Sequence, residues 1–298
     1  MLELRPLQQF LAVAELLHFG RAAQRLHMSQ PPLTQAVRKL EAQLGVQLFE
    51  RSSRSVRLTP AGTALQEAAQ KLLADAAALP AEVRAVAEGL AGRLRLAFVS
   101  TVGFGGLPQW LRSFREACPQ VALALREATL DVQLREFEAG SIDAGFVIHT
   151  PGAAPAGFQR LSIGVEPLVL ALPSSDETPS DDQCRAAPLV IFPREVAPSL
   201  YDAILAHHGS AGQNATVSQE AIQMQTIINL VSAAIGVAWV PASLQGLQRA
   251  GVSYRRMAGA PEVETSLIWR GDAPPVVARF VEHVRAMPEV TAGKPEHP

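Results

Sequence analysis

The sequence predicts two folded parts joined by one long helix: a small α-helical domain at the N-terminus and a larger α/β domain after it. Three observations support this fold class. Apolar residues recur at helical spacing through residues 4–58, an alanine-rich helical stretch follows, and short apolar strands alternate with helices from Arg93 onward. At 298 residues the chain is long enough for two or three domains.

The first 58 residues read as three short helices followed by a hairpin. The first helix is predicted by apolar residues at helical spacing: Leu4, Leu7, Phe10, Leu11, Ala14 and Leu17. A second helix, residues 20–26, ends at His27, and Ser29 suits the N-cap of the next helix because its hydroxyl can accept a free backbone N–H. Pro31 and Pro32 fit the first turn of that third helix, where a missing N–H has little effect.

The third helix has an apolar back and a polar, basic front. Leu33, Val37, Leu40 and Leu44 share one face. Two short helices joined tightly, the second with such a front, are typical of a helix-turn-helix. Arginine, glutamine and threonine are side chains that reach base edges and phosphates. The candidate DNA-contacting residues are Ser29, Gln30, Pro31, Thr34, Gln35, Arg38 and Lys39.

A basic hairpin follows the third helix and reads as a wing against the phosphate backbone. Leu48 and Phe49 form an apolar plug, and Arg51, Arg54 and Arg57 follow within seven residues. Residues 1–58 hold eight Lys and Arg residues against four acids, whereas the rest of the chain holds 18 against 24. A basic head on an acidic body is expected of a small DNA-binding domain attached to another domain.

A long helix is predicted after Thr59-Pro60, which fit an N-cap and a first-turn proline. Its apolar stripe is thin: Leu65, Ala68, Leu72, Ala76, Leu79 and Val83. Such a helix needs a partner, most simply the same helix of a second chain. Pro80 interrupts the pattern, and residues 89–92 fit a hinge.

From Arg93 the pattern changes to two α/β sets. The first alternates strands at 93–99, 121–128 and 143–148 with helices at 107–117 and 131–138. Steps of this length predict a parallel sheet. The second set contains strands at 167–173, 188–192, 214–219, 237–241 and 263–270, and helices at 199–208, 222–234 and 276–287. We expect two lobes, with the C-terminal helix returning to the first.

These patterns closely resemble the LysR-type transcriptional regulators, over essentially the whole chain. The most specific match is AAQRLHMSQPPLTQAVRKLEAQLGVQLFER, followed by LTPAG at residues 58–62. The resemblance implies a winged helix-turn-helix at 1–58, a dimerising linker helix at 59–89 and an effector-binding domain of periplasmic-binding-protein-like fold at 90–298. Its lobes are expected at about 90–161 with 266–298, and at about 162–265. It also implies a homotetramer that binds double-stranded promoter DNA and, as a further partner, RNA polymerase.

Candidate ligand contacts lie where strands end and helices begin, because ligands of open α/β sheets collect there. Ser100, Thr101 and Val102 follow one strand, and Thr129 and His149 follow the next two. Hydroxyls, free N–H groups and helix starts favour a carboxylate or another anion. Two alternatives stay open: Ser100 caps a helix, and His149 is a structurally hydrogen-bonded histidine.

The resemblance is strongest to the subgroup that controls aromatic-compound catabolism, in residues 127–146, 190–205 and 219–243. It implies that Thr129 contributes to an effector pocket for a small aromatic or aliphatic acid. Many relatives carry an arginine where this chain has Val147, Ile148 and His149, which argues against a dicarboxylate. The second-lobe candidates are Phe192, Pro193, Ile222 and Gln223. Arg194 fits either the pocket or a salt bridge at its rim.

Other functions are less well supported, and the alternatives are a DNA-binding redox sensor and a regulator that acts without a small-molecule effector. A redox sensor needs a reactive cysteine beside a resolving one, but Cys118 and Cys184 are far apart in the sequence. No nucleophile elbow, phosphate-binding loop, dinucleotide motif or metal-ligand cluster suggests an enzyme, so no catalytic residue, metal or cofactor is expected. No leader or membrane-length apolar run is evident, and two cysteines suit a reducing compartment, so we expect a cytoplasmic protein.

Overall fold

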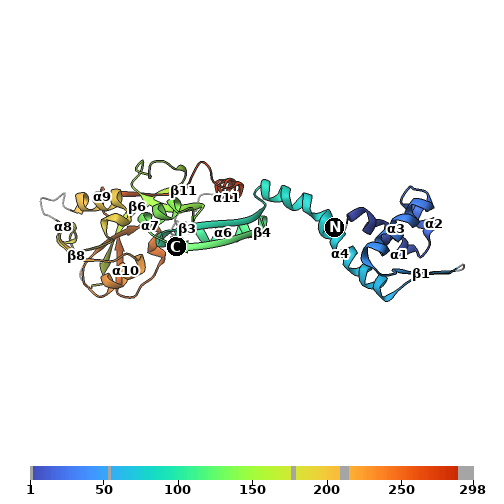
Figure 1. Ribbon diagram of the computed structural model, residues 1–298. Coiled ribbons are helices and arrows are strands. Elements are labelled where there is room, and N and C mark those ends of the chain that lie inside the picture. Colours follow the sequence, from blue (N-terminus) through green and yellow to red (C-terminus); the bar gives the residue numbers. More distant parts are fainter. Residues whose placement is uncertain (1–2, 53–54, 176–178, 209–214, 288–298) are drawn as a thin grey trace. The chain divides into compact units, whose positions relative to one another are not determined.

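The computed structural model describes residues 3–52, 55–175, 179–208 and 215–287 (Figure 1). The chain divides into two compact units, Met1–Arg84 and Ala85–Pro298. Each unit has its own buried apolar core. Arg54 of the predicted wing lies outside the described residues.

The first unit packs a helical core against a short hairpin. Its elements are α1 (Leu4–Leu16), α2 (Phe19–Arg25), α3 (Gln30–Leu44), β1 (Phe49–Arg51) and β2 (Val56–Leu58). The strands pair antiparallel, and the ring centroids of Phe10 and Phe49 lie 5.4 Å apart in the core. Leu4 and Leu17, predicted to face this core, are exposed. Leu4 begins the helix, and Leu17 ends it in a left-handed conformation with φ of 45°.

The turn between α2 and α3 is tight and passes through His27, whose φ is 53°. Ser29 is the N-cap of α3, but its side chain makes no capping hydrogen bond. The predicted role of this hydroxyl is therefore wrong, although the predicted position is right. Proline in the first turn of α3 is confirmed, and Leu33, Val37 and Leu40 are buried as expected.

Helix α4 (Pro60–Ala87) begins at a side-chain cap. The Thr59 hydroxyl accepts the Gly62 N–H at 3.0 Å and donates to the Gln47 carbonyl at 2.7 Å. The helix continues past Pro80 rather than ending there. Its large apolar side chains leave a largely exposed stripe: Leu72, Leu79, Val83 and Val86.

The second unit is built on a sheet with the strand order β10 (Val252–Arg255), β6 (Gln159–Pro173), β11 (Glu262–Trp269), β5 (Ala144–His149), β3 (Ala91–Phe98) and β4 (Gln120–Glu127). Strand β9 (Ala238–Pro241) adds to this sheet by pairing with β6. The predicted parallel part is confirmed: β3 (Ala91–Phe98) pairs parallel with β4 (Gln120–Glu127) and β5 (Ala144–His149). Alternate side chains face opposite sides, so Phe146 packs in one core and Val147 in another.

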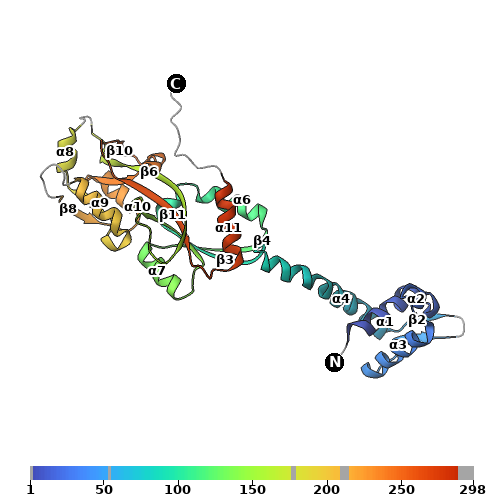
Figure 2. The same ribbon diagram turned by 90° about the horizontal axis from the view of Figure 1, so that it is seen from above.

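Helices cover both sides of this first lobe. Helices α6 (Leu107–Ala117) and α11 (Pro275–Ala286) lie side by side on one face, where the rings of Phe114 and Phe280 are 5.0 Å apart (Figure 2). Helix α7 (Leu130–Glu138) packs through Leu130 and Phe137 on the other face. The C-terminal helix therefore returns to the first lobe, as predicted.

Two long strands connect the lobes. Strand β6 (Gln159–Pro173) and strand β11 (Glu262–Trp269) pair antiparallel along most of their length, with a register shift between Thr265 and Ser266. β11 also pairs with β5 of the first lobe, whereas β6 pairs with β9 (Ala238–Pro241) and β10 (Val252–Arg255) of the second. β6 begins eight residues earlier than predicted, because residues 159–166 form no apolar run.

The second lobe adds a small parallel pair, β7 (Leu189–Ile191) and β8 (Val217–Glu220). Its helices are α8 (Asp181–Ala186), α9 (Pro198–His208) and α10 (Met224–Ser232), with short 3-10 turns at Arg194–Val196 and Ala242–Gly246. In the first lobe, a single helical turn, α5 (Ser100–Gly103), follows β3. The sequence patterns did not predict α5, α8 or β10.

Candidate functional sites

The front of α3 presents polar and basic side chains to solvent. Gln35, Arg38 and Lys39 are exposed, and Thr34 is half-buried with its hydroxyl donated to the Gln30 carbonyl at 3.1 Å. Within the described residues, neither Arg38 nor Lys39 has an ion-pair partner. The exposed front therefore keeps free cations and amide groups, as contact with DNA requires.

The hairpin is fixed to α3 by a carboxylate that sequence reasoning missed. Glu41 is buried and accepts the backbone N–H groups of Leu48 and Phe49 at 3.0 and 3.3 Å. Its other oxygen pairs with Arg51 at 2.8 Å, and the Arg51 guanidinium lies 4.8 Å from the centroid of the Phe19 ring. Arg51 therefore also has a structural role, whereas Arg57 is exposed and forms no ion pair to any described residue.

A concave surface lies where α3 meets the hairpin. Its volume is about 460 Å³, and it contains two arginines beside the buried Glu41. The lining residues are Arg38, Glu41, Ala42, Gly45, Val46, Gln47 and Arg51. It joins the basic front of α3 to the hairpin in one continuous surface.

A second concavity lies between the two lobes of the α/β unit. Its lining includes residues that follow strands and precede helices, as expected for such a fold. Its volume is about 30 Å³. The lining residues are Val99, Ser100, Thr101, Glu127, Ala128, Thr129, Ile148, Phe192, Val196, Ala197, Ile222, Gln223 and Met224. We call this the inter-lobe cavity.

Hydroxyl groups from the first lobe line the inter-lobe cavity. Ser100 is not the N-cap of α5, a position held by Val99, so the capping alternative for Ser100 is wrong. Thr101 is 7% exposed, and its Oγ1 has no hydrogen-bond partner among the described residues. A buried hydroxyl without a partner is unusual in a folded protein and marks a place where a ligand can bind.

Helix α7 begins at the cavity but has an acid in its first turn. Its N-cap, Thr129, makes no capping bond and donates its hydroxyl to Asp131 instead. Burial raises the pKa of Asp131, but hydrogen bonds from Thr129 and Arg135 outweigh burial, so this pKa lies below its ordinary value. Asp131 therefore stays charged at the positive end of α7.

Helix α10, from the second lobe, begins at the same cavity without such an acid. Its N-cap, Gln223, makes no side-chain capping bond, and its first turn contains no acidic residue. The first N–H groups of a helix have no partner within that helix. The start of α10 therefore offers free donors and a positive dipole end to the cavity.

Three predicted contacts do not line the inter-lobe cavity: Val102, His149 and Pro193. Val102 is buried in the first-lobe core. His149 is 1% exposed, with Nδ1 bound to the Thr150 carbonyl at 2.8 Å and Nε2 to the Ser266 hydroxyl at 3.0 Å. His149 is therefore a structurally hydrogen-bonded histidine, the second of the two alternatives. Its position after a strand predicted where its backbone lies, but not the direction in which its side chain points.

Arg194 also belongs to a structural pair. Its Nε and Nη2 donate to the two oxygens of Asp202 at 2.8 and 2.7 Å. The pKa of Arg194 is raised by this hydrogen bonding and by the charge of Asp202. Both side chains are exposed, so the pair is a rim salt bridge and not part of the cavity lining.

The two cysteines offer little support for redox sensing. Both are buried, Cys118 after α6 of the first lobe and Cys184 in α8 of the second. Burial raises the pKa of the Cys184 thiol despite the nearby Arg255, and a raised pKa reduces the reactive thiolate. The described part of the chain contains no cluster of metal ligands and no helix able to cross a membrane.

Two family models match the chain. Residues 4–63 match the model described as "Bacterial regulatory helix-turn-helix protein, lysR family", and residues 87–288 match "LysR substrate binding domain". The fold and these matches define a class of protein: DNA-binding regulators of transcription with a ligand-binding domain. The chain belongs to the LysR family of transcriptional regulators, which confirms the resemblance on which the fold prediction partly depended.

Named regulators match along nearly the whole chain. IlvR of Caulobacter vibrioides is 44% identical over 275 residues, covering 91% of this chain and 93% of IlvR. AlsR of Bacillus subtilis is 36% identical over 266 residues, covering 86% of each. The crystal structure of CbnR, a LysR family transcriptional regulator, is 34% identical with a TM-score of 0.78, covering 95% of this chain and 100% of CbnR.

CbnR is also known in complex with its target DNA, and that structure has a TM-score of 0.79 to this chain at 34% identity, covering 95% of this chain and 99% of the other. The winged helix-turn-helix and the two-lobed, periplasmic-binding-protein-like domain predicted from the sequence are therefore confirmed as the fold class. This chain is a DNA-binding transcriptional regulator.

Proposed function

We propose that this regulator is switched by a small carboxylic acid bound in the inter-lobe cavity. The observation that carries the proposal is Thr101, a residue that lines the cavity and whose hydroxyl is buried without a partner among the described residues. An unsatisfied buried hydroxyl is unfavourable, and a ligand oxygen that accepts its proton removes that penalty. Ser100 and the start of α10 add further donors.

DNA recognition is proposed for the exposed front of the head. Thr34 and Gln35 read base edges in the major groove, whereas Arg38, Lys39 and Arg57 contact phosphates. Ser29, Gln30 and Pro31 lie at the start of α3, where the backbone approaches the duplex. Arg51 contributes through the position of the hairpin, and Arg54 stays a prediction from the sequence.

Assembly is proposed to depend on α4. Leu72, Leu79 and Val86 are spaced by seven residues and exposed, as expected of a helix that pairs with its copy. We propose functional boundaries at 1–58, 59–89 and 90–298, and a homotetramer built from such dimers. Promoter DNA and RNA polymerase are its expected partners, and the cytoplasm is its expected place of action.

The proposed mechanism is a shift of population between two placements of the lobes. The ligand contacts both lobes, so it favours the placement in which both sets of contacts are made. Strands β6 and β11 carry the movement, because their register shift lies at the crossing between the lobes. Through the linker helices, this movement of the lobes changes the spacing of the two DNA-binding domains on DNA.

We further propose that the effector has an apolar carbon skeleton and a single carboxylate. The resemblance to regulators of aromatic-compound catabolism stays a prediction, and both aromatic and aliphatic acids are candidates. The apolar lining, which includes Ile148, Phe192 and Met224, suits either class. The absence of a cationic side chain from the described lining disfavours an acid with two carboxylates.

Thermal unfolding of the full-length protein with a panel of small acids tests the proposal. An acid at a hundredfold its dissociation constant should stabilise the effector domain by about 2.7 kcal/mol. It should also change the affinity for promoter DNA. A protein that binds its promoter but responds to no acid on the panel contradicts the proposed effector class.

A further inference from the structure

The inter-lobe cavity is lined by one ionisable side chain, and it is acidic. Glu127, the last residue of β4, lines the cavity, and no lysine, arginine or histidine does so among the described residues. A simple anion therefore meets only neutral donors and a like charge. A ligand that carries a positive group as well as a carboxylate fits this lining better.

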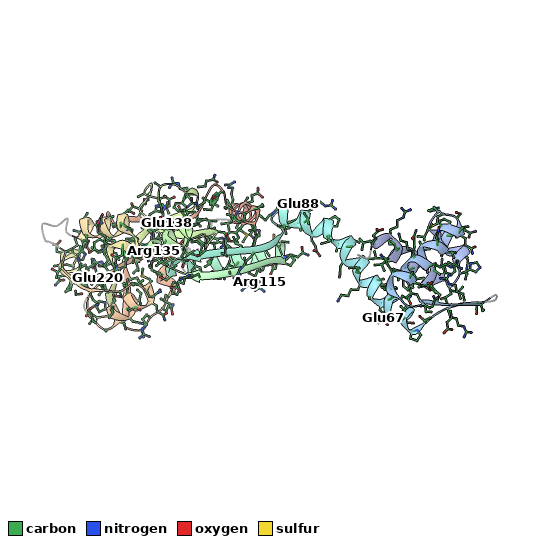
Figure 3. The ribbon with its side chains drawn as sticks, viewed as in Figure 1. Glu67, Glu88, Arg115, Arg135, Glu138 and Glu220 are labelled. Carbon is green, nitrogen blue, oxygen red and sulfur yellow. The ribbon has the colours of Figure 1, made fainter. Side chains whose placement is uncertain are left out.

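Glu127 is available to such a group. It is exposed, and no described residue forms an ion pair with it. Its neighbour Arg126 points to the other face of the strand and pairs with Glu136. Arg135, labelled in Figure 3, is held by Asp131 at 2.9 Å. Arg126 and Arg135 therefore already have acidic partners.

The two helix starts at the cavity differ in charge. Asp131 already occupies the positive end of α7, so this side of the cavity is negative together with Glu127. The start of α10 has neither an acid nor a side-chain cap, and α10 is nine residues long. Thr101, which is 7% exposed and has an unpartnered buried hydroxyl, lines the same cavity. The cavity is thus bipolar, with donors in one part and a carboxylate in another.

We propose that the effector is a small aliphatic α-amino acid bound as its zwitterion. Its carboxylate accepts from the start of α10 and from Thr101, and its ammonium group pairs with Glu127. Val99, Ile148 and Met224 provide an aliphatic surface for the side chain. This inference rests on the proposed function, of which it specifies the ligand class.

Calorimetry on the full-length protein tests the inference with matched probes. L-valine and 2-hydroxy-3-methylbutanoate share one carbon skeleton and one carboxylate, and they differ only in the ammonium group. We expect wild-type protein to bind L-valine up to about fivefold more tightly, the upper end of the range for an exposed ion pair. Glu127→Gln should abolish this preference, and it should leave the affinity for the hydroxy acid unchanged or raised.

Glu138→Gln is the matched control, because Glu138 is an exposed glutamate of α7 that does not line the cavity (Figure 3). It should keep the wild-type preference. Equal binding of the two probes by wild-type protein, or an unchanged preference in Glu127→Gln, overturns the zwitterion but leaves an acid-binding cavity in place. If neither probe nor any acid of the panel binds, the inference and the proposed function both fail.

Discussion

The carboxylate of Glu41 joins the recognition helix to the hairpin, since its Oε2 lies 2.8 Å from Nη2 of Arg51. Its Oε1 accepts two backbone N–H groups, at Leu48 and Phe49. One side chain in α3 thereby fixes the strand that begins the wing.

Glu41→Gln should destabilise the head. The amide has one oxygen to accept from the hairpin, and its N–H₂ group cannot pair with Arg51. We expect a loss of about 1–3 kcal/mol, the range for a buried group left without its charged partner. Chemical denaturation followed by helix content measures it. Glu50→Gln is the control, because Glu50 is exposed on β1, and an equal loss in both variants contradicts the role of Glu41.

If α3 contacts base edges, a substitution on its front should reduce the discrimination between DNA sequences rather than weaken binding to all sequences equally. Gln35→Ala should reduce the difference between promoter variants by about 1–3 kcal/mol if one bidentate base contact is lost. Titration of operator variants at constant salt measures it. Gln43→Ala, an exposed change further along α3, should keep the discrimination. Full discrimination in Gln35→Ala removes this residue from the reading surface.

Phosphate contact by the hairpin predicts a change in salt dependence. Arg57→Ala should weaken all sequences similarly and lower the slope of log affinity against log salt by about one. Binding isotherms at several salt concentrations, with operator and unrelated DNA, measure the slope. Arg5→Ala, an exposed change in α1, serves as control. An unchanged slope in Arg57→Ala places this arginine away from phosphate.

Pairing through α4 predicts that the exposed stripe is sensitive to charge. Leu72 is 47% exposed in the single chain, and Leu72→Asp should weaken the dimer because it buries an unpaired charge in the pair. Sedimentation at several concentrations measures dissociation. Gln70→Asp adds the same charge outside the predicted apolar stripe and should keep the wild-type assembly. The same assembly in both variants shows that α4 does not hold the copies together.

A buried carboxylate at the lobe crossing predicts sensitivity to acid. Burial raises the pKa of Glu264, but hydrogen bonds from Ser162, Gly152 and Ser266 and the charge of His149 outweigh burial, so this pKa lies below its ordinary value. A lowered folded pKa gives stability that is present above the unfolded pKa and is lost as pH falls through the folded one. Glu264→Gln should therefore flatten the fall in effector-domain stability below pH about 4.5.

The control for that measurement is Glu262→Gln, which changes an exposed carboxylate of the same strand. Its unfolding free energy should follow the wild-type pH curve. The comparison uses the slope with pH, because Glu264→Gln also removes contacts at every pH. A wild-type slope in Glu264→Gln shows that another group carries the acid sensitivity.

Local patterns predicted the elements whose apolar faces repeat regularly. The buried face of α3 and all of α6 follow from spacing alone, because each packs one side of a helix on a core. The first half of β6 does carry a strand signal, which the prediction missed: Leu161, Ile163 and Val165 alternate with polar or small residues. Its pairing with β11 is a tertiary contact that no local pattern contains.

Some residues of the candidate sites were likewise predictable from local patterns, whereas others depend on tertiary contacts. Strand ends correctly placed Thr101 and Thr129 at one cavity, because the topology of a parallel sheet brings such ends together. Helical spacing places Glu41 beside the apolar face of α3, four residues after Val37 and three before Leu44, but its hydrogen bonds to the hairpin are tertiary contacts that spacing does not show. The direction of His149 was equally hidden, because its partner Ser266 is 117 residues away.

Thr101→Val separates a functional hydroxyl from a structural one. The two side chains have nearly the same shape, and the Thr101 hydroxyl has no partner among the described residues. Its removal should therefore leave the stability of the ligand-free protein unchanged or slightly raised. Effector affinity should fall by roughly 1–3 kcal/mol, the range for hydrogen bonds to a charged group.

Thermal unfolding and calorimetry on the same full-length samples give both quantities. Thr216→Val, an exposed change that does not line the cavity, should alter neither. Promoter binding without effector should be normal in both variants, because the head has its own core. A less stable Thr101→Val protein with wild-type effector affinity makes the hydroxyl structural and places the ligand elsewhere. A stable protein with weakened binding ties the inter-lobe cavity to the signal that controls transcription.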